Sequence, residues 1–222
     1  QILVFLENNN IIAGMPLPFY STRRIKLPSL TQKMGVLFED FSDLKYTTKL
    51  EKEKKIIYAF VDILKKEKKS YNMNFDWHFE NWLPFYWKGY EQTTRYTYVI
   101  DFNQKSPDII WKDMDQKTRN SIAKAQKNFL TVSETDDIKK FYEINRLTFK
   151  RQNLRIPYSL DYIERLYSNF KEDICLFQAI DNNKNVHAMN FYIKDKKSVY
   201  YLMSGADPNY RSSGAQNLIH WE

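Results

Sequence analysis

The sequence predicts an α+β fold, with helices that flank mostly antiparallel sheets. Three helical hydrophobic patterns, over about 115–128, 136–151 and 159–170, precede the strands of the second half. Three apolar runs of strand length follow them, at about 174–180, 186–193 and 198–204. Because the links between these runs are only a few residues long, the runs are typical of an antiparallel meander. Helices first and a meander afterwards indicate segregated α and β elements.

The first half begins with a predicted β-hairpin. Apolar runs at 2–6 and 11–20 are separated by Glu7-Asn8-Asn9-Asn10, and asparagine tolerates the positive φ that a tight hairpin turn requires. From 49 to 69, apolar residues recur at helical spacing, which predicts an amphipathic surface helix. Its lysines are interpreted as a solvated face rather than a nucleic-acid patch.

Two more strands are expected in the first half. Residues 71–79 and 95–102 alternate apolar and polar side chains, which is the period of a half-buried strand. The segment 82–90 between them is aromatic and is interrupted by Pro84 and Gly89. Its rings either pack in a core or pocket or stack on bases, and packing is the commoner use of such clusters.

Length and composition predict a globular chain of one large domain or two small ones. The 222 residues are 43% hydrophobic and 16% aromatic, which excludes intrinsic disorder. A formal net charge of +7 suits a polyanionic partner, such as a nucleotide or RNA, without requiring one. No apolar stretch approaches the roughly 18 residues of a membrane helix, so no membrane insertion is expected.

The single cysteine and the two ends of the chain lead to two further expectations. Cys175 cannot form an intrachain disulfide, which favours a reducing compartment and a cytoplasmic localisation. The first residues form a strand pattern already under way, and residues 216–222 form a helical pattern with no stop signal. We therefore expect the sequence to be truncated at both ends.

A strand, an asparagine-rich turn and a second strand occur in both halves. Residues 4–15 and 179–189 share this order. A repeat of such long period indicates two related domains, whereas a chance similarity of two hairpins explains it equally well.

Several enzyme classes lose their usual support because their motifs do not occur in the sequence. HExxH, a Walker loop, GxSxG and metal-spaced Cys/His sets are missing from the sequence, so no metal is expected. The histidines His78, His187 and His220 share no motif, and each is interpreted first as a structural residue.

The best candidate site lies near the C-terminal end of the sequence. A strand at 199–203 leads through 204–208 to Arg211-Ser212-Ser213-Gly214-Ala215, which opens a helix. Small residues let a ligand approach free backbone N–H groups, and Arg211 adds a positive charge, so a pyrophosphate would fit. An ordinary connection between a strand and a helix, with small residues near the cap, explains the same pattern equally well.

The strand, the Arg-x-x-Gly-Ala turn and the helix resemble the acyl-CoA motif of the GNAT N-acyltransferases. Arg211 and Gly214 match that motif, whereas Gln216 occupies its last small position. Much more of the chain resembles the FemAB-like, BioF2-like branch of this superfamily, which is bacterial in type. The matching stretches are 12–17, 30–35, 96–101, 118–127, 148–152 and 204–206.

This resemblance implies two tandem GNAT-like domains with mixed, mostly antiparallel sheets flanked by helices. Residues 1–100 would form the first domain, N-terminally incomplete, and residues 101–222 the second, C-terminally incomplete. The repeated hairpin then has an explanation, because each half carries its own strand meander. No heptad pattern matches the long helical arm that some Fem transferases insert.

The resemblance also implies roles for residues of the candidate site. Main-chain groups of Met203 and Ser204 would contact the carbonyl of the acyl donor. Tyr201, His187 or a positioned water would serve as the general base. The pyrophosphate would be held by a loop of five residues, Arg211, Ser212, Ser213, Gly214 and Ala215.

Three classes of function follow from these observations. An N-acyltransferase would move an acyl group from acyl-CoA, acetyl-CoA included, to an amine of a small molecule or a peptide. A Fem-type aminoacyltransferase would take its amino acid from charged tRNA and add it to a peptidoglycan precursor, which the charge of +7 favours. A non-catalytic GNAT-like binding module is favoured by Gln216 and by the lack of an obvious base. Arg119 and Lys124 would meet an anionic acceptor or lie on a solvated helix face.

Overall fold

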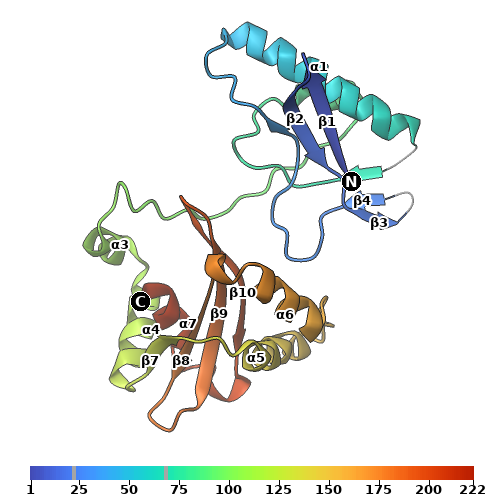
Figure 1. Cartoon of the computed structure of the whole chain (residues 1–222). Coiled ribbons are helices and arrows are strands. Elements are labelled where there is room, and N and C mark those ends of the chain that lie inside the picture. The colour runs from blue at the N-terminus through green and yellow to red at the C-terminus, as the bar shows by residue number, and fades with distance from the viewer. Residues whose placement is uncertain (22–23, 68–69) are drawn as a thin grey trace. The chain divides into compact units, whose positions relative to one another are not determined.

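The computed structural model describes residues 1–21, 24–67 and 70–222. The chain divides into two compact units, Gln1–Tyr98 and Val99–Glu222 (Figure 1). Each unit combines helices with β-sheet, so the predicted α+β class is confirmed. That each unit is an incomplete GNAT-like domain, with a boundary at residue 100, stays a prediction.

The first unit contains two small sheets. One is antiparallel, in the order β1-β2-β5, and consists of β1 (Ile2–Glu7), β2 (Asn10–Pro16) and β5 (Leu37–Phe38). The other consists of β3 (Phe19–Ser21), β4 (Arg24–Lys26) and β6 (Ser70–Asn72). Within it β4 pairs with β6 in parallel and with β3 in antiparallel fashion, so the expected mixed, mostly antiparallel pairing is confirmed.

The predicted hairpin is present between β1 and β2. Its turn uses the two asparagines in the left-handed region, Asn8 with φ 51° and Asn9 with φ 65°. The second strand ends at Pro16, four residues earlier than expected, and the chain then continues through Pro18 into β3. Proline donates no N–H to a strand ladder, which explains the early end.

The helix α1 (Tyr46–Lys66) supplies more buried residues to the core of the first unit than any other described element. Its apolar face packs against the first sheet, where Phe60 meets Phe5 edge to face at 6.5 Å between ring centroids. The predicted helix covered 49–69, and its positions 68–69 lie outside the described residues. The buried apolar residues recur at helical spacing and are Ile56, Ile57, Phe60, Val61 and Leu64.

The strand predicted over 71–79 is wrong beyond Asn72, where β6 ends. The chain then follows an irregular course to the short helix α2 (Leu83–Trp87). Rings of this segment pack on one another instead, and the centroids of Phe75 and Phe79 lie 4.4 Å apart. The alternation of apolar residues therefore reflects an aromatic cluster formed by a loop.

The strand predicted over 95–102 is also wrong, since this segment has no regular structure. The side chains of Tyr96 and Tyr98 are 93% and 103% exposed. No strand in the described part of the chain pairs with residues 95–102. An extended segment without a partner gains no hydrogen bonds from a strand ladder. Alternation by itself was therefore insufficient to predict a strand.

The second unit contains a four-stranded antiparallel sheet in the order β10-β9-β8-β7. The three predicted helices and the three predicted meander strands are all present within a few residues of the expected bounds. The unit also contains α3, β7 and two short 3-10 helices, which were not predicted. In chain order, its main elements are α3 (Pro107–Asp113), α4 (Gln116–Lys127), β7 (Thr131–Glu134), α5 (Ile138–Arg151), α6 (Leu160–Asn169), β8 (Ile174–Ile180), β9 (Val186–Lys194), β10 (Val199–Ala206) and α7 (Ala215–Trp221).

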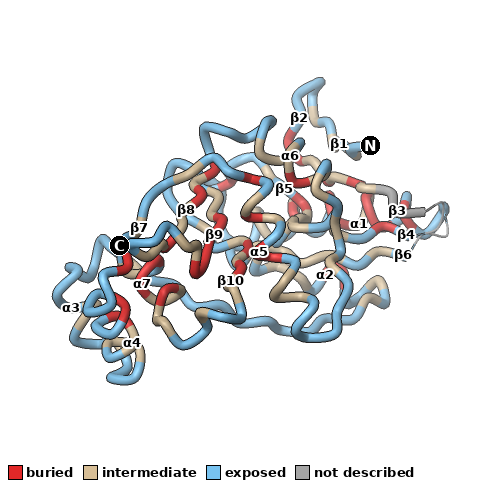
Figure 2. Tube along the Cα trace, turned by 90° about the horizontal axis from the view of Figure 1, so that it is seen from below, coloured by how far each residue is buried: buried red, intermediate tan, exposed pale blue. Residues whose placement is uncertain are grey.

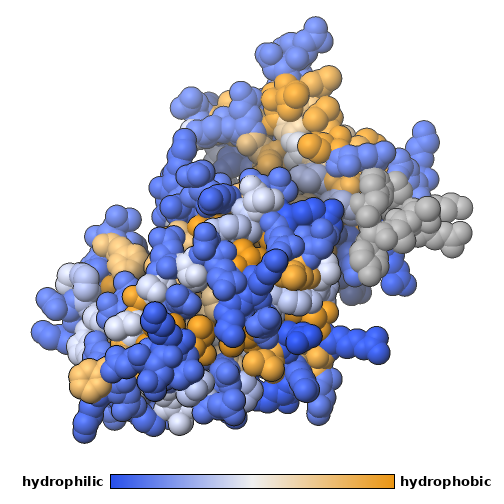
Figure 3. All heavy atoms as spheres, turned by 60° about the horizontal axis from the view of Figure 1, so that its bottom comes forward, coloured by the Kyte–Doolittle hydropathy of each residue, from blue (hydrophilic) through white to orange (hydrophobic). Residues whose placement is uncertain are grey.

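Helices cover both faces of this sheet (Figure 1). On one face, Ala188 of β9 packs with the apolar residues of α4 and α7. On the other face, the ring of Phe191 contacts Phe141 of α5, with 5.4 Å between centroids. Because alternate residues of a strand point to opposite faces, β9 is buried along most of its length, and Figure 2 shows its buried positions next to those of β8. The visible outer surface in Figure 3 is mainly hydrophilic.

Candidate functional site

The strand β10 lies at the edge of the described sheet, and α5 approaches it closely there. A Cβ at Gly205 would lie 2.5 Å from the backbone N of Asn145, so only glycine fits. The side-chain Nδ2 of Asn145 donates to the carbonyl of Ser204 at 2.6 Å, and the N–H of Ala206 donates to Oγ1 of Thr148 at 3.3 Å. These contacts fix the backbone of β10 at its open edge.

The hydroxyl of Tyr158 holds Asn145 in place by donating to its Oδ1 at 2.8 Å. Burial raises the pKa of Tyr158 to about 12, so this hydroxyl stays protonated and able to donate. In antiparallel strands the N–H and C=O of one residue point to the same side. Since the carbonyl of Ser204 points to α5, its N–H is expected at the open edge as well.

A small pocket of ≈ 90 Å³ lies where the loop after β10 meets the start of α7. Four of the five predicted pyrophosphate residues line it, Ser212 being the exception. The lining is Ser121, His187, Ala188, Ala206, Tyr210, Arg211, Ser213, Gly214, Ala215, Gln216 and Asn217. We call it the loop pocket.

Gly214 is a steric requirement of the loop pocket. Its φ is +82°, and a Cβ there would lie 2.1 Å from the carbonyl oxygen of Ser121 on α4. The hydroxyl of Ser213 accepts a hydrogen bond from the N–H of Ala215 at 3.3 Å. Arg211 is exposed, and no carboxylate pairs with it within the residues that the structure covers.

His187 forms the buried wall of the loop pocket, with only 6% of its surface exposed. Its ring stacks on Tyr210 at 3.9 Å, and its Nε2 lies 3.3 Å from Oδ2 of Asp181. Hydrogen bonds from Asn185 above all, and then from His187 and Asn183, lower the pKa of Asp181 to about 2. The Nδ1 atom of His187 is buried, and no atom of the described residues bonds to it. Such an unsatisfied group is costly unless a ligand or water meets it.

A second polar cluster lies on the face of the sheet that α7 covers. Asn190 of β9 is 0% exposed, and both ends of its amide are bonded. Its Nδ2 donates to the hydroxyl of Tyr192 at 2.8 Å, and its Oδ1 accepts from Nε2 of Gln216. The Tyr192 hydroxyl also lies 2.8 Å from Nδ1 of His220. Gln216, which departs from the GNAT motif, therefore ties α7 to β9 together with His220.

The same cluster extends to β10 through Tyr201. The hydroxyl of Tyr201 donates to Oγ of Ser204, and Nε2 of Gln216 lies 3.4 Å from it. The ring of Tyr201 meets that of His220 nearly at right angles, with 4.6 Å between centroids. We call Asn190, Tyr192, Tyr201, Ser204, Gln216 and His220 the polar network.

Desolvation changes the acid–base properties of the polar network. It raises the pKa of Tyr192 to about 12 and that of Tyr201 above its ordinary value of 10.0. Partial desolvation also lowers the pKa of His220 below 6.5. Near neutral pH the two tyrosines are therefore protonated, and the imidazole of His220 is uncharged and able to accept a proton.

The structure separates the two side chains predicted as bases. Tyr201 is paired with Tyr192, which stands five residues beyond His187 on β9. At about 3.4 Å per residue the two positions are about 17 Å apart along the strand. His187 belongs to the loop pocket and Tyr201 to the polar network, while the side chain of Met203 is buried, with 6% exposed.

The guanidinium of Arg119 binds backbone carbonyls of the chain, so Arg119 has a structural role. Its guanidinium donates to the carbonyl oxygens of Trp111 at 3.1 Å, Lys112 at 2.9 Å and Met114, at the end of α3. It therefore satisfies carbonyls that a helix end leaves unpaired. Lys124 is exposed on α4, as expected for a solvated helix face.

Sequence reasoning missed the contributions of Asn145, Asn190, Tyr192 and His220. An asparagine inside an apolar strand run was an available signal for Asn190, because a buried amide requires partners. The departure of Gln216 from a small residue was a second signal. The sequence around Asn145 gives no indication of its contact with β10.

Residues 1–21, 24–67 and 70–222 contain neither a metal-binding cluster nor a membrane-spanning helix. No cluster of three or more His, Cys, Asp or Glu side chains there is arranged to bind a metal ion. No helix in these ranges combines the length and hydropathy needed to cross a bilayer.

Comparisons with known proteins agree with this geometry. Residues 114–222 match the family model of the acetyltransferase (GNAT) domain. The whole chain also resembles the crystal structure of FemX, with a TM-score of 0.66 and 12% sequence identity over 100% of this chain and 74% of FemX. No curated protein matches the chain. The expected resemblance to FemAB-like proteins of the GNAT superfamily is confirmed.

Proposed function

We propose that the chain transfers an acyl group from acyl-CoA to an amine acceptor. The match of residues 114–222 to the acetyltransferase (GNAT) domain supports acyl transfer in general. The loop pocket supports acyl-CoA as the donor, because it lies where the GNAT motif places a pyrophosphate. It combines an exposed arginine with a buried histidine that lacks a hydrogen-bond partner at one nitrogen.

The loop pocket would bind the phosphates of the donor. Arg211 supplies a charge that no carboxylate of the described residues neutralises. When the ring of His187 is protonated, both nitrogens donate, one to Asp181 and the other, Nδ1, to an anion in the pocket. The ≈ 90 Å³ volume suits a phosphate group rather than a whole nucleotide.

The open edge of β10 would receive the carbonyl of the acyl group. The N–H of Ser204 is expected there, held in direction by the bond from Asn145 to the Ser204 carbonyl. A fixed N–H aimed at a developing oxyanion is the usual electrostatic aid to acyl transfer. Met203, next to Ser204 in β10, stays a predicted main-chain contact, but by the same alternation its N–H points towards β9, so the proposal rests on Ser204.

The polar network would accept the proton of the attacking amine and donate a proton to the leaving group. Neutral His220 is the proposed proton acceptor, since its lowered pKa leaves it uncharged at neutral pH. Tyr201, whose raised pKa keeps it protonated, is the proposed donor to the leaving thiolate. The bond between Tyr192 and His220 orients the imidazole.

Titration of the chain with acetyl-CoA, followed by tryptophan fluorescence, tests the proposed donor. Arg211→Ala should weaken binding about 10- to 150-fold, which corresponds to the about 1.5–3 kcal/mol of a hydrogen bond to a charged group. Lys127→Ala is the matched control, because Lys127 is also exposed but lies outside the loop pocket. Saturable binding that only Arg211→Ala weakens supports the proposal.

A Fem-type aminoacyltransferase is the second candidate, and the FemX-like fold together with the net charge of +7 favours it. Its donor would be charged tRNA and its acceptor a peptidoglycan precursor. Salt-sensitive binding of charged tRNA without binding of acetyl-CoA would favour it over the first candidate. Binding of neither would favour a non-catalytic module. A cytoplasmic setting is proposed in both enzymatic cases, because both donors are cytoplasmic metabolites.

A further inference from the structure

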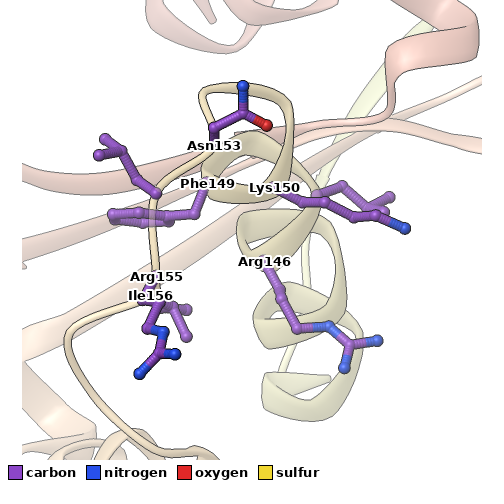
Figure 4. Close-up of a pocket in the computed structure, with 8 residues that line it drawn as sticks. Arg146, Phe149, Lys150, Asn153, Arg155 and Ile156 are labelled. Atoms are coloured by element: carbon purple, nitrogen blue, oxygen red, sulfur yellow. The ribbon is translucent and has the colours of Figure 1, made fainter.

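A larger pocket lies at the C-terminal end of α5 (Figure 4). The helix α5 covers the face of the sheet opposite to α7. The pocket has a volume of ≈ 730 Å³, within the roughly 300–1,000 Å³ typical of small-molecule sites. It is formed by the last two turns of α5 and by the segment 153–156 that follows the helix. We call it the α5 pocket.

Local backbone geometry builds the apolar wall of the α5 pocket. Asn153 has φ 55°, and the N–H of Leu154 bonds back to the carbonyl of Phe149 at 3.0 Å. This left-handed turn reverses the chain at the helix end and brings Leu154 and Ile156 alongside the helix. Phe149 is braced from behind by Tyr158, with 6.2 Å between ring centroids. The wall is therefore preformed.

Three cations line the pocket together with this apolar wall. Arg146 and Lys150 extend from α5 to one side in Figure 4, and Arg155 lies on the other side, on the segment 153–156. No acidic residue lines the pocket, and none of the three cations has a carboxylate partner anywhere in the described ranges. Of the neighbouring cations, Lys140 pairs with Glu143 and Arg165 with Asp161, whereas Arg151 has no carboxylate partner among the described residues. The three cations of the pocket are therefore uncompensated, although they are not the only such cations on this side of the chain.

We propose that the α5 pocket binds an amphipathic anion, that is, a phosphate or carboxylate group carried on an apolar ring or chain. The arginines suit bidentate contact with such an anion, and Leu147, Phe149, Leu154 and Ile156 cover its apolar part. The site is separate from the loop pocket, because α5 and α7 cover opposite faces of the sheet. It does not depend on the proposed acyl transfer.

Isothermal titration calorimetry with 1-naphthyl phosphate tests this proposal, with inorganic phosphate and 1-naphthol as the two half-ligands. We expect 1-naphthyl phosphate to bind at least tenfold more tightly than either half-ligand. The double variant Arg146→Gln/Arg155→Gln should weaken its binding at least tenfold. Leu154→Ala should weaken binding of 1-naphthyl phosphate without changing that of inorganic phosphate, because Leu154 contributes only to the apolar wall.

Arg151→Gln is the matched control, since Arg151 is an exposed arginine of the same helix that does not line the pocket. Equal weakening by Arg151→Gln would overturn the proposal in favour of a diffuse positive surface. Absence of binding by the unmodified chain would overturn it outright. These exposed substitutions are not expected to unfold the protein, which a thermal melt of each variant checks.

Vesicles of phosphatidylcholine with and without phosphatidic acid separate the two sources of such an anion. Binding to the acidic vesicles that the double variant abolishes would assign the pocket to a lipid-borne anion. Binding of 1-naphthyl phosphate without binding to vesicles would assign it to a soluble one. Either result supports the pocket where 1-naphthyl phosphate binds, and absence of 1-naphthyl phosphate binding overturns the proposal whatever the vesicles show.

Discussion

The polar network and the loop pocket lie on the same two strands, but they differ in how far their hydrogen bonds are satisfied. In the network, the buried amide of Asn190 is bonded at both ends, and Gln216 links it to α7. In the loop pocket, Nδ1 of His187 is buried without a partner among the described residues, and Arg211 is exposed.

This difference indicates different tasks. A satisfied network holds its members in one geometry, as a proton-transfer group requires. An unsatisfied cluster pays a desolvation cost that a ligand can recover, as a binding site requires. Substitutions in the loop pocket should therefore change the affinity for the donor. Substitutions in the polar network should change the rate of acyl transfer.

The largest expected effect comes from His220→Gln, which breaks the polar network at its proton acceptor. We expect the rate constant of acyl transfer to fall about 100-fold or more, with little change in donor affinity. Because the pKa of His220 is lowered, activity of the unmodified chain should be constant above pH 6.5 and should decline only as the pH falls through that lower value. Steady-state rates across pH measure both effects.

If the activity of His220→Gln declined at low pH in the same way as that of the unmodified chain, the proton transfer would belong to another group. The pH profile makes this distinction, because a merely structural role of His220 would lower the rate without removing the decline at low pH.

Gly214→Ala breaks the loop pocket and should destabilise the fold. The added Cβ meets the carbonyl of Ser121 at 2.1 Å in a left-handed conformation, so we expect a loss of about 1–3 kcal/mol. Gly14→Ala is the control, since its nearest neighbours lie 3.9 Å away. Urea denaturation compares the two variants. Equal stability of both would show that the loop does not pack on α4 as described.

Asp181→Asn has the smallest expected effect and sharpens the description of the loop pocket. The pKa of Asp181 is about 2 in the folded chain against an ordinary value of 3.8. Its stabilising effect is therefore complete above about pH 4 and is lost as the pH falls towards 2. Unfolding free energies between these pH values should vary less in Asp181→Asn than in the unmodified chain. An unchanged slope would mean that the hydrogen bonds from Asn185 and His187 do not stabilise the carboxylate.

The sequence predicted the second unit well because local signals and tertiary packing agree there. The helices α4, α5 and α6 have strong apolar periodicity, and β8 to β10 are joined by short polar turns. The hairpin of the first unit was equally accessible, since Asn8 and Asn9 adopt the positive φ that the turn requires.

Alternation misled the predictions at 71–79 and 95–102, where no extended sheet forms. A strand needs a partner, and the partner is decided by distant parts of the chain. The loop pocket was accessible from a contiguous motif. The polar network was not, because Asn190, Tyr201, Gln216 and His220 meet only after β9, β10 and α7 have packed together.

The most direct test of the division between binding and chemistry is an NMR titration of the histidine rings with coenzyme A. The ¹⁵N resonances of His187 and His220 are assigned by His187→Gln and His220→Gln. We expect Nδ1 of His187 to shift strongly on saturation, because it gains its missing partner, and the ring of His220 to change little. A large shift at His220 with none at His187 would contradict the assignment of the donor phosphates to the loop pocket.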